Sequence, residues 1–586
     1  MPYRAGRVIA IAVVAAFFFT SALRAQEVTS HPYPGITLIK RTDQITNPTR
    51  QVKMNIVIVD LAAAEVRFKM TPPTPGLPGT PGNPPAVCVP PAPFLPWPCP
   101  APPMEVIRRP TLGALEDAHA QVAINSHFFA PFPVVNTPQG QAQAGFAYLI
   151  GLAASRGNVY SAFETPIQNY AIMADSPAVN IDRDNHASIV HRDPADPSGL
   201  GVIENVTLWN ALSGSGQIIT NGVKTIPCYL PLAGCSLVPP GNANYSNSNS
   251  WYNLINARTA IGIIEDPAHP ERGQKLLLFT VDVRPLPFLP SPPNPPNTPN
   301  PDRSQGMRVP EVADVLLQYG VYNALNLDGG GSTSMAMQDP ADNERRVINV
   351  SSDNPPRAEA SNLAVYSDGI DPVSTAEASP APNANGWNKE ASVTVTLDAT
   401  DERSGNAGNL LGWVDQLQYA LDGAQTGPET VFPGHPTSVI VSAEGITTVT
   451  YSATDAAGNR EGDREHTVRI DRTRPDINGL PVSGDCVLWP PNHEMRPVAA
   501  VTASDALSGV AAGALQVTAT SSSPSSPDDV LVAPDGAGGF VVYLRAERRG
   551  NEPNRVYTIT ATATDRAGNA RTATATCVVP HDQGND

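Results

Sequence analysis

Basic residues are scarce in this sequence. Its 586 residues include 38 Lys and Arg against 55 Asp and Glu, so the formal net charge is −17. Because an acidic chain repels phosphate backbones, nucleic acid is not expected as a partner. Hydrophobic residues make up 41% of the chain, enough to build cores, which excludes general disorder. The length allows three or four domains of about 100–200 residues each.

Long apolar runs are missing after the first 25 residues. That first segment combines Arg4 and Arg7 with an apolar run at 8–19 and small residues at 21–25. The run is too short to span a bilayer whose apolar core is about 30 Å thick, so residues 1–25 are predicted to be a cleaved secretory signal. We therefore expect a secreted, periplasmic or extracellular protein whose mature chain has no transmembrane anchor.

Cysteine is rare, and the absence of any Cys-x-x-Cys pair disfavours a zinc site. Six cysteines suit an oxidising compartment, and many pairings are compatible with the sequence alone. Proximity and domain layout favour three disulfide bonds: Cys88–Cys99, Cys228–Cys235 and Cys486–Cys577.

Proline is abundant but local. Residues 71–103 contain 15 prolines and residues 285–301 contain nine. Proline removes backbone donors and favours polyproline II, so both stretches are predicted to be surface insertions without strands or helices.

Between and around these insertions the pattern is mixed. Residues 51–60 and 275–282 are β-rich runs, residues 311–319 have a helical apolar face, and residues 323–327 form a short apolar segment before a glycine cluster. We therefore predict one α+β domain, a mixed-sheet α/β arrangement, over residues 26–368.

The chain after residue 368 has period-two alternation typical of strands, for example at 393–397 and 447–451. Two all-β immunoglobulin-like sandwiches are predicted, at residues 369–478 and 479–586. The string Asp-x-x-Gly-Asn occurs at 455–459 and again 110 residues later at 565–569. Such a string predicts a tight turn, with Asp bonding to its own backbone. A Ca²⁺ site is the alternative, and otherwise no cofactor or metal is expected.

The most informative segment is Asn326–Met335, NLDGGGSTSM. Three consecutive glycines cost conformational entropy, which a close backbone approach would justify. Their N–H groups can form an anion-binding nest, to which the following hydroxyls add donors, and Asp328 adds a carboxylate. The predicted nest consists of Gly329, Gly330, Gly331, Ser332 and Thr333.

This segment resembles the signature of the phosphodiester glycosidase family. Further segments resemble family elements in the same order: 123–129 (AINSHFF), 212–214 (LSG), 258–262 (RTAIG), 281–284 (VDVR), 304–307 (SQGM) and 347–349 (VIN). The resemblance spans most of residues 36–366. Residues 386–473 resemble a bacterial immunoglobulin-like module, and residues 488–582 resemble a hyalin-repeat module.

The resemblance implies a hydrolase that breaks the glycosidic bond of a sugar-1-phosphodiester such as an N-acetylglucosamine-1-phosphodiester. Asp328 and Asp282 are then candidates for the two carboxylates that such chemistry uses, and His127 for a general acid. The same resemblance favours Arg258 and Arg284 as phosphate ligands, with Asn125, Asn326 and Ser213 as further substrate contacts.

Simpler structural roles are open for each of these residues. The arginines can form ion pairs with Asp282 or Asp328, His127 can pack against Phe128 and Phe129, and the asparagines can cap turns. Partners are expected to be a glycan or glycosyl-phosphodiester, with a cell-envelope polysaccharide as one source. Two other functions remain alternatives: a non-catalytic glycan-binding or adhesion protein, and a phosphodiesterase that cuts the P–O bond.

Overall fold

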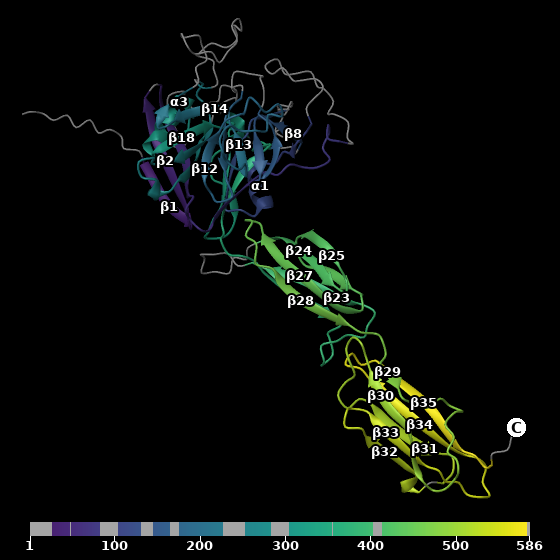
Figure 1. The fold of residues 1–586 in the computed structure, drawn as a ribbon. Helices are drawn as coiled ribbons and strands as arrows, with labels where there is room; N and C mark the ends of the chain where they lie inside the picture. Colours follow the sequence, from purple (N-terminus) through teal and green to yellow (C-terminus); the bar gives the residue numbers. More distant parts are fainter. Residues whose placement is uncertain are drawn as a thin grey trace, which may run out of the picture. The chain divides into compact units, whose positions relative to one another are not determined.

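The computed structural model describes residues 26–582 except 47, 82–102, 131–144, 164–174, 227–251, 253, 283–303, 354, 402–412 and 525. Several predicted features lie outside the described residues: the signal peptide, the insertion at 285–301, Arg284, Cys88, Cys99, Cys228 and Cys235. The described part of the protein is mostly β, with 50% of its residues in strands and 6% in helices. It divides into two compact units, one ending at Gly369 and one beginning at Ile370 (Figure 1).

The largest sheet of the first unit has eight strands, and each neighbouring pair is antiparallel. In spatial order these are β1 (Gln26–Tyr33), β2 (Ile36–Thr46), β3 (Thr49–Asp60), β17 (Lys275–Val281), β16 (Arg258–Ile264), β18 (Val321–Asn326), β14 (Gly216–Thr220) and β15 (Val223–Lys224).

Three smaller sheets complete this unit. One consists of β20 (Arg345–Val347), β19 (Met335–Gln338), β6 (Val122–Asn125), β21 (Asn362–Ser367) and β4 (Val66–Met70). Another consists of β10 (Asn158–Ser161), β9 (Ala153–Ser155), β13 (Asn210–Ser213), β11 (Ala178–Ile181) and β12 (Ala187–Val190). The third consists of β5 (Val106–Ile107), β8 (Phe146–Leu149) and β7 (Phe129–Ala130). The α-helices of the described residues are α1 (Thr111–Ala118) and α3 (Val309–Gln318), and short 3₁₀ turns occur at η2 (Pro270–Arg272) and η3 (Gly330–Ser332).

The large sheet is buried on both faces. Leu276 and Leu278 of β17 pack into a core cluster shared with β4, β6, β19 and β21, whereas Leu277 and Phe279 pack into a second cluster with the apolar face of α3. Burial on both faces explains why this strand is a continuous apolar run. The strands and the helix expected at 51–60, 275–282, 311–319 and 323–327 are confirmed to within a few residues as β3, β17, α3 and β18.

The second unit contains two modules, each with two antiparallel sheets around its own apolar cluster. The first tail module consists of β22 (Val373–Ser379), β23 (Val393–Thr400), β26 (Thr437–Val441), β25 (Gly427–Pro433), β24 (Val414–Gly423), β27 (Gly445–Asp455) and β28 (Arg464–Ile470). The second tail module consists of β29 (Asp476–Asn478), β30 (Met495–Ser504), β33 (Phe540–Arg545), β32 (Val530–Pro534), β31 (Gln516–Ser521), β34 (Arg555–Thr564), β35 (Ala570–Val579) and η4 (Pro527–Asp529).

The repeated Asp-x-x-Gly-Asn strings form the same turn in both modules, which confirms that prediction. Oδ1 of Asp455 accepts hydrogen bonds from the N–H groups of Gly458 and Asn459 at 2.6 and 2.7 Å. Asp565 accepts the corresponding pair, from Gly568 and Asn569, at 2.7 and 2.8 Å. Both turn glycines have φ of +96°, a conformation that favours glycine.

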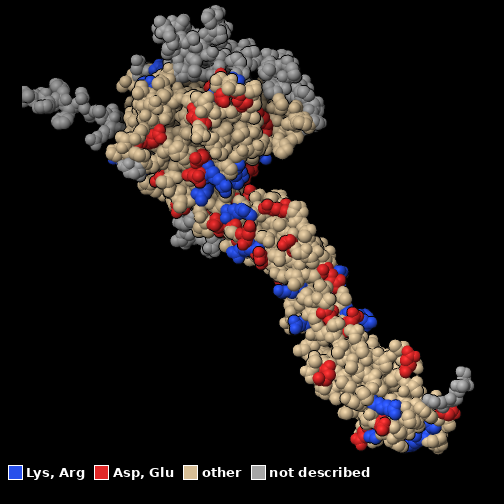
Figure 2. Space-filling view, in the orientation of Figure 1, with Lys and Arg blue, Asp and Glu red and all other residues tan. Residues whose placement is uncertain are grey.

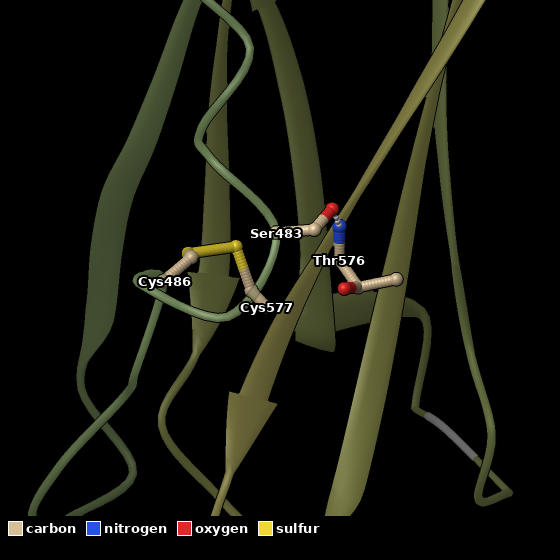
Figure 3. The surroundings of a disulfide bond; sticks show 4 residues. All are labelled: Ser483, Cys486, Thr576 and Cys577. Carbon is tan, nitrogen blue, oxygen red and sulfur yellow. Dashed lines mark hydrogen bonds between the residues drawn. A yellow bond between two sulfur atoms is a disulfide. The ribbon is translucent and has the colours of Figure 1, made fainter.

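A disulfide bond joins Cys486 to Cys577 of β35, which confirms this part of the cysteine prediction (Figure 3). Close by, the Thr576 N–H donates to Oγ of Ser483 at 3.1 Å. The bond ties the segment before β30 to the last strand of the module. No helix in the described part of the chain has the length and apolar character needed to cross a membrane.

Candidate active site

The signature segment connects two sheets of the first unit. It leaves the large sheet at the end of β18, passes through η3 and enters β19 of the neighbouring sheet. The N–H of Leu327 donates to the carbonyl of Thr259 in β16 at 2.9 Å, and that of Asp328 donates to the carbonyl of Ser126 at 3.0 Å. The loop is therefore held against both sheets.

Asn125, predicted to contact substrate, lies beneath this loop and is 1% exposed. Its Nδ2 donates to the Asp328 carbonyl at 2.7 Å. Its Oδ1 accepts from the N–H of Ser334 at 3.0 Å and from Oγ1 of Thr259 at 2.9 Å. The side-chain amide thus holds the loop in place from inside the fold.

The geometry of the predicted anion nest differs from the expectation, because most of its N–H groups donate within the protein. That of Gly329 donates to Oδ1 of Asp328 at 2.9 Å, and that of Gly330 donates to the carbonyl of Ala257 at 2.8 Å. Those of Ser332 and Thr333 donate to carbonyls of the same loop. The glycines shape the turn rather than present a row of donors.

Gly331 has a specific steric reason to be glycine. A Cβ at this position would lie 2.2 Å from Nη2 of Arg357 and 2.2 Å from Oδ2 of Asp353. These two side chains form an ion pair at 2.9 Å, and Nη1 of Arg357 donates to Oγ of Ser332 at 3.1 Å. The missing side chain therefore allows a guanidinium to pack directly on the loop.

Asp328 is 2% exposed beside this guanidinium. Its Oδ2 is buried and has no hydrogen-bond partner among the described residues. Burial raises its pKa to about 7, although Arg357 and Ser332 act in the opposite direction. A carboxyl with this pKa can hold or release a proton near neutral pH.

Glu359 is the second carboxyl of this site, and it was not among the residues predicted from the sequence. It is 2% exposed, and neither of its carboxylate oxygens has a hydrogen-bond partner in the described part of the chain. Burial raises its pKa well above the usual range, the charge of Asp328 raises it further, and Arg357 and Ser332 oppose the rise. Glu359 also borders a cavity of about 250 Å³.

Asp282 and Arg258 lie in different surroundings from Asp328. The charges that act on Asp282 are those of Lys53 and Lys40, and burial raises its pKa to about 7. Arg258 is fully buried and donates from Nε to the Met307 carbonyl at 3.0 Å and from Nη2 to the Leu254 carbonyl. Successive side chains of a strand face opposite ways, so Arg258 lies on the α3 face whereas Thr259 faces the signature loop.

The other predicted residues contribute to the fold around the loop. Burial lowers the pKa of His127 to about 4, so its imidazole is neutral at pH 7. Its Nδ1 lies 2.8 Å from Oγ of Ser361, and its Nε2 lies 3.0 Å from the N–H of Ser213. Asn326 donates from Nδ2 to Oγ of Ser215 at 2.7 Å. Thr333 is fully buried, and its Oγ1 has no partner in the described ranges.

A group of three carboxylates in the second unit has the donor chemistry for a cation. Oxygens of Asp471, Asp505 and Asp565 all lie within 4.8 Å of one another. Oδ2 of Asp471 accepts from the N–H of Ser508 at 3.1 Å, and Asp565 is the first residue of the repeated turn. Burial raises the pKa of Asp471.

Comparison with known proteins bears on the first unit. Residues 119–366, which include Asp328, Arg357 and Glu359, match the profile of the family described as phosphodiester glycosidase. The chain carries a phosphodiester glycosidase domain. The signature segment and most of the ordered elements that carried the resemblance fall inside the matched range of this domain.

Solved structures that resemble the chain include the zebrafish N-acetylglucosamine-1-phosphodiester alpha-N-acetylglucosaminidase catalytic domain auto-inhibited by pro-peptide. It is 19% identical, with 58% of this chain and 87% of that chain covered and a TM-score of 0.33. A hypothetical protein from Synechocystis is 14% identical, with coverage of 59% and 64% and a TM-score of 0.33. Fibronectin(III)-like modules of Clostridium thermocellum are 14% identical, with coverage of 36% and 98% and a TM-score of 0.16. The search of curated proteins found no match.

Arg357 and Glu359 were not predicted as site residues, because they lie in irregular chain before β21, outside any recognised motif. Their only signal was a pair of charged residues, in the string Arg-Ala-Glu, directly before a strand that reads as buried. Charged side chains at the end of a buried strand are candidates for a site.

Proposed function

We propose that the protein is an exported hydrolase that cleaves the glycosidic bond of a sugar-1-phosphodiester, an N-acetylglucosamine-1-phosphodiester or a close analogue. The supporting observation is the pair of buried carboxyls, Asp328 and Glu359, that face a guanidinium at the signature loop of a phosphodiester glycosidase domain. Glycoside hydrolysis commonly uses two carboxyls in different protonation states.

In this mechanism Asp328 is the ionised carboxylate and Glu359 is the protonated acid. The Gly329 N–H donates to Asp328 and favours its charged form, whereas the charge of Asp328 favours the protonated form of Glu359. Asp328 stabilises the positive charge that develops at the anomeric carbon. It also either activates a water molecule or attacks the anomeric carbon directly. The C–O bond breaks as Glu359 donates its proton to the leaving phosphate oxygen, which leaves as a monoester. Water supplies oxygen to the sugar, and the proton that water loses returns to the carboxyl pair.

Glu359 replaces Asp282 as the proposed partner of Asp328. The charge of Asp328 acts on Glu359, whereas the charges that act on Asp282 are two lysines. Arg258 and His127 have no part in the proposed mechanism. Arg284, which lies outside the described residues, remains a proposed phosphate ligand. The positive charge of Arg357 stabilises the site as negative charge accumulates on the leaving phosphate.

An isotope experiment tests the bond that breaks. The mature chain is incubated with methyl N-acetylglucosamine-1-phosphodiester in H₂¹⁸O, and both products are analysed by mass spectrometry. We expect ¹⁸O in free N-acetylglucosamine and none in methyl phosphate. Label in a phosphate product would instead indicate a phosphodiesterase. Binding of the diester without turnover would favour the non-catalytic alternative, a glycan-binding or adhesion protein.

Export and the natural substrate are part of this proposal. The apolar segment at residues 8–19 supports secretion, and the disulfide bond Cys486–Cys577 is compatible with an oxidising compartment. We propose a cell-envelope glycan that contains glycosyl-phosphodiester bonds as the source of substrate. Cell fractionation followed by detection of the mature N-terminus tests the location.

A further inference from the structure

Arg108 is a buried arginine that the mechanism above does not use. It follows β5, and its N–H donates to the carbonyl of Gly145 at 2.7 Å. Its guanidinium lies over the ring of Phe129, 5.9 Å from the centroid, and a Cβ on Gly145 would lie 2.6 Å from its Nη2. The residue is 7% exposed and precedes the range matched by the family profile.

The donors of Arg108 are not used by the described part of the protein. Its Nε and Nη1 are buried and have no hydrogen-bond partner there. Arg357 differs in this respect, because Nε and Nη2 contact Asp353 and Nη1 donates to Ser332. A buried guanidinium without hydrogen bonds is costly, so such a group favours an anion that reaches it.

Arg108 lies near the site that contains Glu359. The segment that carries it runs antiparallel to the segment of Glu359, because Arg109 and Glu359 exchange two backbone hydrogen bonds of 2.8 Å. The charges of Glu359 and Arg357 both act on Arg108. No direct hydrogen bond joins Arg108 to Glu359 among the described residues, and Nε and Nη1 of Arg108 have no other partner there.

We propose that Arg108 is a substrate-binding residue that donates hydrogen bonds to the phosphate of the sugar-1-phosphodiester. A phosphodiester carries one negative charge and oxygen acceptors, which match a guanidinium with unused donors. The identity of the substrate rests on the proposed function. Oxyanion binding by Arg108 rests on its burial and on Nε and Nη1, which have no partner among the described residues.

The test is a titration of the full mature chain with inorganic phosphate, monitored by thermal unfolding and by ³¹P NMR. The variants are Arg108→Gln, Arg108→Lys and, as the matched control, Arg109→Gln. Arg109 is the adjacent residue, but its side chain is 55% exposed and pairs with Asp117. We expect wild type and Arg109→Gln to bind phosphate with equal Kd.

In Arg108→Gln the Kd is expected to rise about 10- to 100-fold, because charged hydrogen bonds are lost. Arg108→Lys keeps the charge but loses the planar donor set, so we expect an intermediate Kd. If Arg108→Gln fails to fold, the phosphate Kd of Arg108→Lys decides whether Arg108 binds the anion. A wild-type Kd in either folded variant, or no phosphate binding by wild type, overturns the proposal.

Kinetics on a sugar phosphodiester separate this inference from the proposed function. Where wild type turns the diester over, Arg108→Gln should raise KM about 10- to 100-fold with a smaller change in kcat. A fall in kcat with unchanged KM contradicts a binding role. If wild type cleaves no sugar phosphodiester, the proposed function fails, while the phosphate titration still decides whether Arg108 binds an oxyanion.

Discussion

Asp328 and Asp282 are similarly buried but have different charged neighbours. Both are almost fully buried, and burial raises the pKa of each to about 7. Asp328 lies beside Glu359 and Arg357, whereas Asp282 lies near two lysines. Comparison of Asp328 with Asp282 therefore separates the effect of a buried carboxyl on stability from its effect on catalysis.

We predict that Asp328→Asn and Asp282→Asn both stabilise the fold above pH 7. A raised folded-state pKa means that stability is fully present below about pH 4 and is lost as pH rises toward 7, because the fold then contains a buried charge. Removal of that charge should add on the order of 2 kcal/mol at pH 8 and little at pH 4. Thermal unfolding at the two pH values measures this.

The same two variants should differ in kcat. Asp328→Asn is expected to lower kcat by at least about 100-fold, since the charge that meets the developing cation is lost. Asp282→Asn should keep near wild-type kcat. The opposite result, with activity lost in the Asp282 variant and kept in the other, would restore Asp282 to the mechanism and remove Asp328.

The pH dependence of wild-type turnover should follow the carboxyl pair. We expect kcat/KM to rise with pH through about 7 as Asp328 ionises and to fall at higher pH as Glu359 loses its proton. Glu359→Gln should lower activity and abolish the descending limb. An unchanged bell-shaped profile in this variant would show that another group supplies the proton.

Gly331→Ala is expected to disrupt the site through packing alone. The new Cβ would meet the Arg357–Asp353 ion pair at 2.2 Å, so this pair must shift away from Ser332. We predict a destabilisation of about 1–3 kcal/mol and a fall in kcat of at least about 10-fold. Gly113→Ala in α1 is the control, because its nearest contact would be at 3.9 Å. Equal unfolding temperatures and rates in the two variants would contradict the steric argument.

At the scale of elements, the second tail module depends on a covalent link between its first and last segments. Cys486 and Cys577 are 91 residues apart in sequence, and the first tail module contains no cysteine. Replacement of both by Ser should lower the free energy of unfolding of the second module by about 2–5 kcal/mol, because the unfolded chain gains freedom. Calorimetry should show one transition moved and the others unchanged. Calorimetric scans that coincide for the variant and wild type would contradict a stabilising role of the disulfide bond.

The tail strands illustrate how local pattern becomes structure. In β34 buried and half-buried residues alternate over all ten positions, as the period-two pattern predicts. In β17 the pattern is a continuous apolar run because both faces are covered. Either pattern identifies a strand, but neither tells which strand will pair with it.

At the scale of the whole molecule, the proposed chemistry belongs to the first unit alone. Asp328, Arg357, Glu359 and Arg108 all precede Gly369, where this unit ends. A chain of residues 26–369 should therefore fold and retain turnover, with kcat/KM within about threefold of the full mature chain. Circular dichroism measures the folding of this fragment, and the diester assay measures its kcat/KM. A soluble, folded but inactive fragment would show that the tail contributes to the site.

The net charge of the whole molecule bears on how a phosphodiester substrate is held. The net charge is −17, and Figure 2 shows acidic and basic side chains interspersed over the drawn face of the second unit. A substrate with repeated phosphates would be repelled by such a chain at long range, so local cations are needed to hold a phosphodiester. In our proposal Arg357 and Arg108 are the local cations of the first unit.

The sequence by itself determined the local features. The strands at 51–60 and 275–282 could be predicted from β-rich runs of strand length, and the helix at 311–319 from its apolar face. The repeated Asp turns, the disulfide Cys486–Cys577 and the signature loop were also predictable, since each depends on a few adjacent residues or on chain layout. The predicted alternation of helices and strands overestimated the helical share of a protein that is mostly β.

Only the tertiary structure decided which charged groups meet. Glu359 follows Asp328 by 31 residues and lies in irregular chain before β21, and Arg108 precedes Arg109, which forms an isolated bridge with Glu359. Arg258 belongs to a segment that resembles a family motif. Because side chains alternate along β16, however, Arg258 lies on the α3 face and Thr259 faces the signature loop. Strand pairing and sheet packing set these distances, and both depend on contacts between residues far apart in the chain, which no local pattern encodes.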